Sequence, residues 1–157
     1  MKVRNVMTHD VVTCRPEETL GALAGKMWDG DCGVIPVVDD QNRPIGLITD
    51  RDAFIAAATR NQRPSEIRVQ DAMHPASLVT VGPDDDVRTA LQRMASSQVR
   101  RLPVVDEHGA LVGIMTLSDP ILHASRVGGG EHQAEIVRTL EAICMPRQPN
   151  GRAQVSA

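Results

Sequence analysis

Two threonine–aspartate pairs have the composition and spacing of a site for a phosphorylated sugar. Thr49 precedes Asp52 by three residues, and Thr116 precedes Asp119 by the same interval. Each threonine lies where an apolar run gives way to an expected helix, so its hydroxyl and the first backbone N–H groups of that helix suit a phosphate. An aspartate one turn further on can accept hydrogen bonds from both hydroxyls of a ribose. The two pairs are therefore candidate ligand contacts.

The same spacing also has a purely structural explanation. A threonine before a helix and an acidic residue three positions later can form a capping box, in which each side chain bonds to the other's backbone N–H group. Both pairs keep the same two residue types, which favours a binding role, because serine, asparagine or glutamate would cap equally well. Spacing alone leaves both explanations open.

The two pairs belong to a long internal repeat. The segment at 34–52, VIPVVDDQNRPIGLITDRD, returns 67 residues later at 101–119 as RLPVVDEHGALVGIMTLSD, and seven of the 19 positions are identical. The same shift aligns Val12-Thr13 with Val79-Thr80. An internal period determines the architecture, and two copies predict a pseudo-symmetric pair. Since copies of about 60 residues bury little surface alone, we expect them to share one core.

Hydrophobic periodicity predicts the order β-α-β-β-α in each copy, and hence an α+β fold. Short β-branched runs bounded by turn residues indicate strands, and apolar residues at i, i+3, i+4 and i+7 indicate helices. The expected strands are 11–14, 35–38, 45–49, 78–81, 102–105 and 111–116, and the expected helices begin at 16, 50, 83 and 118.

The chain divides into four segments on this basis. The first repeat covers 1–62, with a polar lead-in at 1–7, and the second repeat covers 63–127. After a run of three glycines, an amphipathic periodicity predicts an extra helix within 128–145. We expect the polar tail at 146–157 to be disordered.

Composition argues against several classes of function. A net charge of −3 and only two aromatic residues, Trp28 and Phe54, argue against binding to nucleic acid. No apolar run reaches the ~20 residues of a membrane span, and no signal peptide is recognisable, so a cytoplasmic location is expected. Cys14, Cys32 and Cys144 lack the spacing of a zinc site or a disulfide framework, and no metal is expected. Cys14 and Cys144 could form a redox-sensitive tie if the last helix folded over the first copy.

The ordered motifs resemble those of a tandem pair of CBS domains, the regulatory Bateman module. The matching segments span residues 3–126 and are IPVVD with GLITDRD, LPVVD with GIMTLSD, and the openings NVMTHDVVTC and DAMHPASLVTV. The chain is similar to the stand-alone pairs of the hypoxic-response type. The resemblance implies two repeats packed through their sheets and two equivalent clefts for AMP, ADP, ATP, NAD or S-adenosylmethionine. It also implies a homodimer in the form of a four-repeat disc.

The resemblance assigns roles within those clefts. The ribose and phosphate contacts would be Thr49, Asp52, Thr116 and Asp119, and the backbone contacts to adenine would come from Val12, Thr13, Val79 and Thr80. The base would lie between aliphatic side chains, for each of which core packing is the alternative: Val34, Ile48, Val99 and Met115.

Two consecutive arginines distinguish the second copy from the first. Arg100 and Arg101 could bind phosphate as forked donors, or they could face solvent or pair with Asp31 or Glu107. The first copy has Gly33 and Val34 at the equivalent positions. The two clefts should therefore differ in charge, and at most one should favour a polyphosphate.

The resemblance implies a non-catalytic regulatory module that senses an adenine nucleotide, with roles in energy sensing or a stress response and an unidentified protein target. The nucleotide would be a regulatory ligand and not a required cofactor. The alternative is a ligand-free structural dimer, or one tuned by its cysteines, that acts through protein contacts. An enzyme is not expected, because a nucleophile needs an adjacent base and an orienting group, and the sequence offers no such set.

Overall fold

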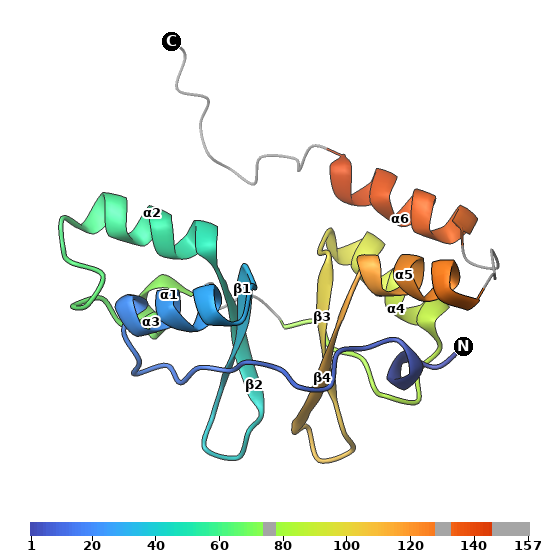
Figure 1. Cartoon of the computed structure of the whole chain (residues 1–157), viewed down its shortest axis with the longest axis horizontal. Coiled ribbons are helices and arrows are strands. Elements are labelled where there is room, and N and C mark those ends of the chain that lie inside the picture. Colours follow the sequence, from blue (N-terminus) through green and yellow to red (C-terminus); the bar gives the residue numbers. More distant parts are fainter. Residues whose placement is uncertain (74–77, 128–132, 146–157) are drawn as a thin grey trace, which may run out of the picture.

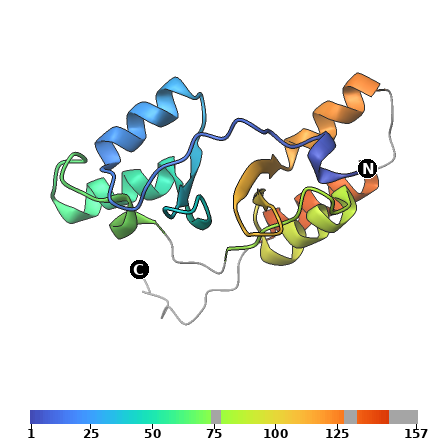
Figure 2. The same ribbon diagram turned by 90° about the horizontal axis from the view of Figure 1, so that it is seen from below.

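The protein consists of two α/β halves set side by side, with a sheet on the inner side of each half and helices on the outer side (Figure 1, Figure 2). The structure is a computed structural model and describes residues 1–73, 78–127 and 133–145. The first half contains α1 (Leu20–Asp29), β1 (Val34–Val38), β2 (Pro44–Thr49), α2 (Asp50–Arg60) and α3 (Val69–Ala72). The second half contains the short 3-10 helix η1 (Val3–Asn5), α4 (Val87–Ser97), β3 (Arg101–Val105), β4 (Leu111–Thr116), α5 (Ser118–Val127) and α6 (Gln133–Cys144).

Each half is built on one antiparallel hairpin, and the two hairpins have the same register. Val34 pairs with Thr49 in the β1–β2 hairpin, and Arg101 pairs with Thr116 in the β3–β4 hairpin. Both ladders also shift register near the end of their first strand. This correspondence confirms the pair of repeats and the α+β class that the sequence predicts.

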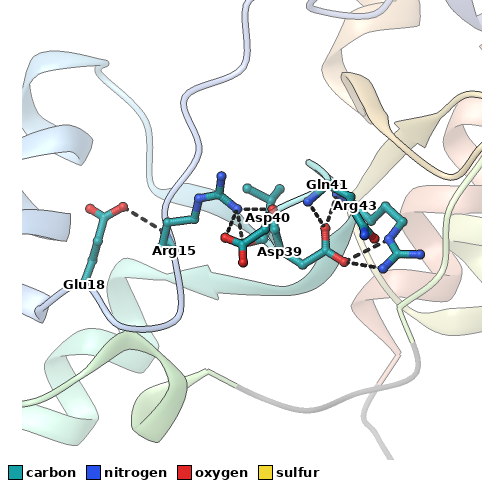
Figure 3. A network of polar contacts seen from close by, with 7 residues as sticks. Arg15, Glu18, Asp39, Asp40, Gln41 and Arg43 are labelled. Carbon is teal, nitrogen blue, oxygen red and sulfur yellow. Dashed lines mark hydrogen bonds and ion pairs between the residues drawn. The ribbon is translucent and has the colours of Figure 1, made fainter.

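An aspartate closes the turn of each hairpin in the same way. Asp39 Oδ1 accepts hydrogen bonds from the backbone N–H groups of Gln41 at 2.9 Å and Arg43 at 2.8 Å (Figure 3). The Arg43 backbone N–H, together with its guanidinium, holds the pKa of the Asp39 carboxyl below its usual value. In the second turn, Asp106 Oδ1 accepts from the N–H groups of residues 108 and 110, both at 2.9 Å. These Asx turns explain the aspartate that follows Pro-Val-Val in both copies.

The two hairpin turns are bonded directly to each other. The Leu111 N–H donates to the carbonyl of Asn42 at 2.8 Å, and the Asn42 side-chain amide donates to the carbonyl of Leu111 at 3.1 Å. Asn42 has a φ of 59°, in the left-handed region that asparagine enters more readily than most residues. This pair joins the two halves at the turn end of their sheets.

The buried side chains form two clusters, one in each half, and not the single shared core expected from the sequence. The first half buries Leu20, Leu23, Ile35, Val37 and Ile48, and the second buries Ala90, Leu91, Met94, Leu102 and Met115. Each half therefore has a core of its own.

Each core is completed by the opening segment of the other repeat. Val3 and Met7, expected in a polar lead-in, are buried in the core of the second half. Ile67 and Val69, near the start of the second repeat, are buried in the core of the first half. The start of the first repeat thus packs in the second half, and the start of the second repeat packs in the first half. We call these two stretches the exchanged segments.

Backbone hydrogen bonds fix the exchanged segments. Val3 N–H donates to the carbonyl of Asp85 at 3.0 Å, and Thr8 and Ile114 exchange a reciprocal pair at 2.9 and 3.0 Å. In the first half, Leu20 N–H donates to the carbonyl of Ile67 at 2.9 Å. The N-terminal segment is therefore an integral part of the second half.

We expect Gly113→Ala to destabilise the second half, because the N-terminal segment lies directly against this glycine. A Cβ at position 113 would lie 2.7 Å from Met7 Sδ and 2.9 Å from the carbonyl oxygen of Thr8. Overpacking of this kind costs about 1–3 kcal/mol, which urea unfolding measures. Gly82→Ala is the matched control, since the nearest atoms to a Cβ there belong to the Asp85 side chain and lie 3.8 Å away, an ordinary contact distance. Equal losses in the two variants would contradict the expectation.

Two of the expected strands, at 11–14 and 78–81, do not form. Each segment is joined to its sheet by a single parallel bridge, Cys14 to Val37 and Val81 to Val104. The Cys14 N–H donates to the carbonyl of Pro36 at 3.1 Å, and the Cys14 carbonyl accepts a hydrogen bond from the N–H of Val38 at 2.9 Å. Proline has no N–H to continue the ladder, and both copies have one at this place in the sheet, so the pairing stops after one residue.

Helices α1 and α4 begin later than the sequence predicts. The Thr19 hydroxyl caps α1 by accepting from the N–H of Ala22 at 3.2 Å, and the Asp86 carboxylate caps α4 by accepting from the N–H of Arg88 at 2.9 Å. The prolines at 16 and 83 therefore precede the helices.

The short helix α3 has no counterpart in the expected order. The extra helix is α6, and it lies on α4 and α5 (Figure 1), whereas the glycine run and the tail at 146–157 fall outside the described residues.

Candidate functional site

A cleft with three arginines opens between the two halves, at the end of the sheets opposite the hairpin turns. We name it the arginine cleft, and its volume is about 660 Å³. The end of β2 and the start of α2 form one wall, the segment that leads into β3 forms the other, and α6 closes a third side. The lining residues are Gly33, Val34, Leu47, Thr49, Asp50, Arg51, Gln98, Val99, Arg100, Arg101, Leu140, Ile143 and Cys144.

The arginine cleft carries an excess of positive charge. Arg51 and Arg100 are exposed and Arg101 is half-buried. Within the part of the chain that the structure describes, no carboxylate forms an ion pair with any of these three guanidinium groups. Asp50 is the single acidic residue of the lining, and its Oδ1 accepts a bond from the Arg51 backbone N–H at 2.7 Å. Three guanidinium groups beside one carboxylate favour an anionic ligand.

Thr49 and Asp52 form the capping box that the spacing allowed. The Thr49 hydroxyl oxygen accepts from the Asp52 N–H at 3.1 Å, and Asp52 Oδ2 accepts from the Thr49 N–H at 3.0 Å. The hydroxyl also donates to Oδ2 at 2.7 Å. The box begins α2 and presents the threonine to the arginine cleft, so the two explanations of the motif coexist in one place.

Thr116 and Asp119 make a related but looser arrangement at the start of α5. The Thr116 N–H donates to Asp119 Oδ2 at 2.6 Å, while the Thr116 hydroxyl lies 2.8 Å from the hydroxyl of Ser118. Burial raises the pKa of the Asp119 carboxyl above its usual value, and the bonds from Thr116 offset only part of that effect. The charged form of Asp119 is therefore less favoured in the folded chain than in the unfolded chain.

The raised pKa of Asp119 predicts a pH dependence of stability. Because the folded protein holds this proton more tightly, the free energy of unfolding falls as the pH rises from the ordinary value of 3.8 through the raised folded-state pKa. Asp119→Asn removes that dependence. Urea unfolding of both proteins at a series of pH values should give curves that diverge across this window, and parallel curves would exclude the effect.

A second cavity lies at the turn end of the interface between the halves. Its volume is about 480 Å³, and its lining consists of His9, Asp10, Val11, Val12, Thr13, Asn42, Leu111, Val112 and Gly113. It contains one acidic residue and no arginine. The two cavities thus differ in charge.

The structure brings some of the candidate residues together and separates others. The arginine cleft collects Val34, Thr49, Val99, Arg100 and Arg101, and the second cavity collects Val12 and Thr13. Neither cavity is lined by the remaining polar and first-strand candidates, which are Asp52, Val79, Thr80, Thr116 and Asp119. Ile48 and Met115 are 0% exposed and belong to the two cores. We therefore leave these two out of the proposed site.

The cleft also contains residues that the sequence analysis did not select. Arg51 lies inside the first threonine–aspartate motif, between Thr49 and Asp52, and it lines the arginine cleft. Leu140, Ile143 and Cys144 come from α6. Their apolar periodicity indicates a helix, but nothing in the sequence indicates which surface that helix covers.

The disulfide considered for Cys14 and Cys144 does not form, because the last helix does not fold over the first half. Helix α6 packs on the second half, whereas Cys14 is buried in the core of the first. All three cysteines are free thiols. Burial raises the pKa of Cys14 to about 12, so its thiol stays protonated and unreactive at neutral pH.

The arrangement of two α-β-β-α units, with a cavity at each end of the interface between them, matches a known family. The family model for the CBS domain matches residues 3–58 and again residues 69–124. This chain belongs to the CBS-domain family. The two matches account for both repeats, and so confirm the tandem pair.

The similar proteins include stand-alone CBS pairs. Hypoxic response protein 1 of Mycobacterium tuberculosis is 34% identical over 143 residues, which are 91% of this chain and 94% of that protein. The crystal structure of hypoxic response protein I with two coordinated zinc ions has a TM-score of 0.70 and 31% identity, covering 78% of this chain and 98% of that one. An uncharacterized protein of Methanopyrus kandleri, MK0525, is 36% identical over 119 residues, and this CBS chain spans 76% of its own length but 60% of that protein.

More distant solved structures share the fold. The CBS pair of protein MJ0100, in complex with 5-methylthioadenosine and S-adenosyl-L-methionine, has a TM-score of 0.69 and 21% identity over 80% of this chain and 98% of that one. CBSX2 in complex with AMP has a TM-score of 0.67 and 23% identity over 82% of this chain and 98% of that one.

Two further features of the CBS pair concern metals and membranes. In the described ranges, no group of three or more His, Cys, Asp or Glu side chains is placed to hold a metal ion. None of the helices in those ranges has the length and apolar character needed to cross a bilayer.

Proposed function

We propose that this CBS pair is a non-catalytic sensor that binds an adenosine phosphate in the arginine cleft. The observation that carries the proposal is the set of three guanidinium groups, Arg51, Arg100 and Arg101, which have no carboxylate partner among the described residues. Guanidinium groups bind phosphate oxygens through parallel N–H donors. A volume of about 660 Å³ lies within the range of pockets for small ligands.

The other walls of the cleft suit the rest of such a ligand. Thr49 stands at the N-terminus of the 11-residue helix α2, where the helix dipole favours a negative charge. Val34, Leu140 and Ile143 are apolar and can contact a purine ring in place of aromatic side chains. The AMP and S-adenosylmethionine complexes of fold neighbours support an adenosine compound as the ligand class.

The charge of the cleft ranks the candidate ligands. ATP and ADP place more negative charge beside the three arginines than AMP does, and NAD offers a pyrophosphate. S-adenosylmethionine carries a sulfonium cation and an ammonium group, which the three guanidinium groups repel. We therefore expect polyphosphates to bind more tightly than S-adenosylmethionine, and one cleft per chain to take them.

The response to the ligand would pass through α6. This helix supplies part of the cleft wall and also packs on α4 and α5, so a nucleotide that contacts Leu140 or Ile143 changes the contacts that hold α6. A protein target, a cytoplasmic location and a role in energy sensing or stress response belong to the same proposal.

Isothermal titration calorimetry with ATP, ADP, AMP, NAD and S-adenosylmethionine tests the proposed binding. A chain that binds none of the five is not this sensor.

A second candidate function is a ligand-free module that acts through protein contacts. The capping box favours it, since Thr49 and Asp52 already satisfy each other's hydrogen bonds. The two candidates differ in the role of the arginines. In a ligand-free module, Arg100→Gln and Arg101→Gln leave every nucleotide titration as featureless as that of the wild type.

A further inference from the structure

The first residue of α2, Asp50, brings a carboxylate into the lining of the arginine cleft. Its side chain is exposed, and its two oxygens have different surroundings. Oδ1 accepts a hydrogen bond from the Arg51 N–H at 2.7 Å, whereas Oδ2 lies against Gly33, where a Cβ would be only 3.1 Å away. A fixed negative charge in a cleft of this kind opposes the binding of a phosphate group.

The fold does not require an acidic residue at this position. The 67-residue shift pairs Asp50 with Leu117, and the second repeat passes from strand to helix with that leucine. Leu117 is 8% exposed and belongs to the core of the second half. An acidic residue in the first turn stabilises a helix, but Asp52 already provides one in α2, as Asp119 does in α5. The carboxylate of Asp50 is therefore a feature of the first repeat alone.

The first backbone donors of α2 are already bonded within the chain. The Asp50 N–H donates to the Gly33 carbonyl at 3.2 Å, and the Arg51 N–H donates to the Asp50 carboxylate. The Asp52 N–H donates to the Thr49 hydroxyl oxygen at 3.1 Å. Such N–H groups commonly bind a phosphate at the start of a helix. Asp50 thus takes the position of an anion at α2, and a phosphate in the cleft depends on the guanidinium groups.

We propose that Asp50 is a specificity-determining residue, which sets how strongly the arginine cleft distinguishes nucleotides by their number of phosphate groups. This role rests on the proposed function and deepens it. Each further phosphate is attracted by the three arginines and repelled by Asp50. Repulsive groups are a general means of setting specificity, because specificity is a difference between two affinities. Asp50 brings the affinities for ATP and AMP closer together than the arginines alone would.

The difference between these affinities matters because ATP and AMP would compete for one cleft. With the arginines alone, the nucleotide of highest charge would hold the cleft even when AMP is abundant. A carboxylate that opposes each added phosphate reduces the advantage of ATP and leaves the contacts of the adenosine part unchanged. The cleft can then exchange one nucleotide for the other as their ratio changes, which an energy sensor requires.

Asp50→Asn tests this role, because the amide removes the charge but keeps an oxygen that can accept from the Arg51 N–H. Calorimetric titrations of the full chain with adenosine, AMP and ATP, in low salt without divalent cations, compare the variant with the wild type. We expect the affinity for ATP to rise about 10-fold, that for AMP about 3-fold and that for adenosine not at all, because the repulsion scales with the charge of the ligand. The gains should shrink in high salt, which screens the repulsion.

Asp71→Asn is the matched control. Asp71 is exposed on α3 and lines neither the arginine cleft nor the second cavity. The same loss of charge there should leave all three affinities unchanged, and urea unfolding verifies that both variants are folded. Equal gains in the two variants would make the effect one of net charge and would overturn the role of Asp50.

The three ligands also separate this role from the sensor function itself. A gain that increases from adenosine to AMP to ATP supports Asp50 as the specificity-determining residue. An equal change for all three ligands would mean that Asp50 acts through the structure of α2, and it would overturn the role while the sensor stands. Absence of binding by all three, in the wild type and in Asp50→Asn, would overturn the sensor and the role of Asp50 with it.

Discussion

Saturating ATP is expected to raise the free energy of unfolding by about 2.7 kcal/mol when its concentration is near 100 times its dissociation constant. For a chain of this length the midpoint of thermal unfolding should rise by roughly 5–10 °C. ADP and then AMP should give smaller shifts at equal concentration, because fewer phosphate charges meet the arginine cleft. S-adenosylmethionine should give the smallest shift. Differential scanning fluorimetry with a dye, supported by urea unfolding, measures the series.

The arginines should account for most of this stabilisation. A hydrogen bond to a charged group contributes about 1.5–3 kcal/mol, so Arg100→Gln or Arg101→Gln should weaken ATP binding about 10–100-fold. Arg138→Gln is the matched control, since it makes the same change of charge at an exposed position of α6 that does not line the cleft. If Arg138→Gln lowers the ATP shift as much as the cleft variants do, the effect is one of net charge and not of a site.

The two aspartates should differ in the same experiment. Asp52→Ala removes the capping box of α2, which lowers stability by about 1 kcal/mol even without ligand. The informative quantity is therefore the increment that ATP adds to each variant. That increment should shrink more for Asp52→Ala than for Asp119→Ala. Asp52 is bonded to Thr49, which lines the arginine cleft, whereas Asp119 is bonded to Thr116, which does not line it. The reverse order would move the ribose contact to the second half.

The repeat and its hairpins could be predicted from the sequence because their determinants are local. The Pro-Val-Val-Asp runs, the turn aspartates and the threonine starts of α2 and α5 each depend on residues a few positions apart. The same local signals failed at 11–14 and 78–81. There, the backbone partner of each segment is a strand with a proline, and this pairing joins residues far apart in the chain.

The exchanged segments depend on long-range contacts that no local pattern specifies. Val3 and Met7 look like scattered apolar residues in a polar stretch, yet both are buried against a repeat that begins some 60 residues later. The position of α6 is of the same kind. Its apolar face predicts a helix and a partner surface, but two equivalent surfaces exist in a pseudo-symmetric pair, and only packing selects one.

The candidate site could be predicted only in part, because some of its residues are placed by the repeat and others by long-range packing. Thr49, Arg100 and Arg101 are placed at strand ends by the repeat, and they meet in one cleft. An aliphatic residue that touches a ligand looks the same in sequence as one that fills a core. Val34 and Val99 line the cleft, whereas Ile48 and Met115 are enclosed in the cores of the two halves, and only the folded structure separates the two cases.

Met115→Ala is expected to lower the free energy of unfolding by about 2–5 kcal/mol, the cost of removing a long side chain from a packed core. Met115 is 0% exposed and packs in the cluster of the second half with Met94 and Leu102. Urea unfolding measures the loss. Met145→Ala is the matched control, since Met145 is 64% exposed and its substitution should change stability little.

The same variant decides whether Met115 is a core residue or a ligand contact. If it serves the core alone, the stabilisation that ATP adds should be as large in Met115→Ala as in the wild type, measured at a temperature where both are folded. If the side chain sandwiches the base, the variant should instead lose most of the ATP increment while its own stability falls by much less than a core truncation demands. The two outcomes are separated by two measured free energies, one without ligand and one with it, and only the first agrees with a methionine fully enclosed by its own half.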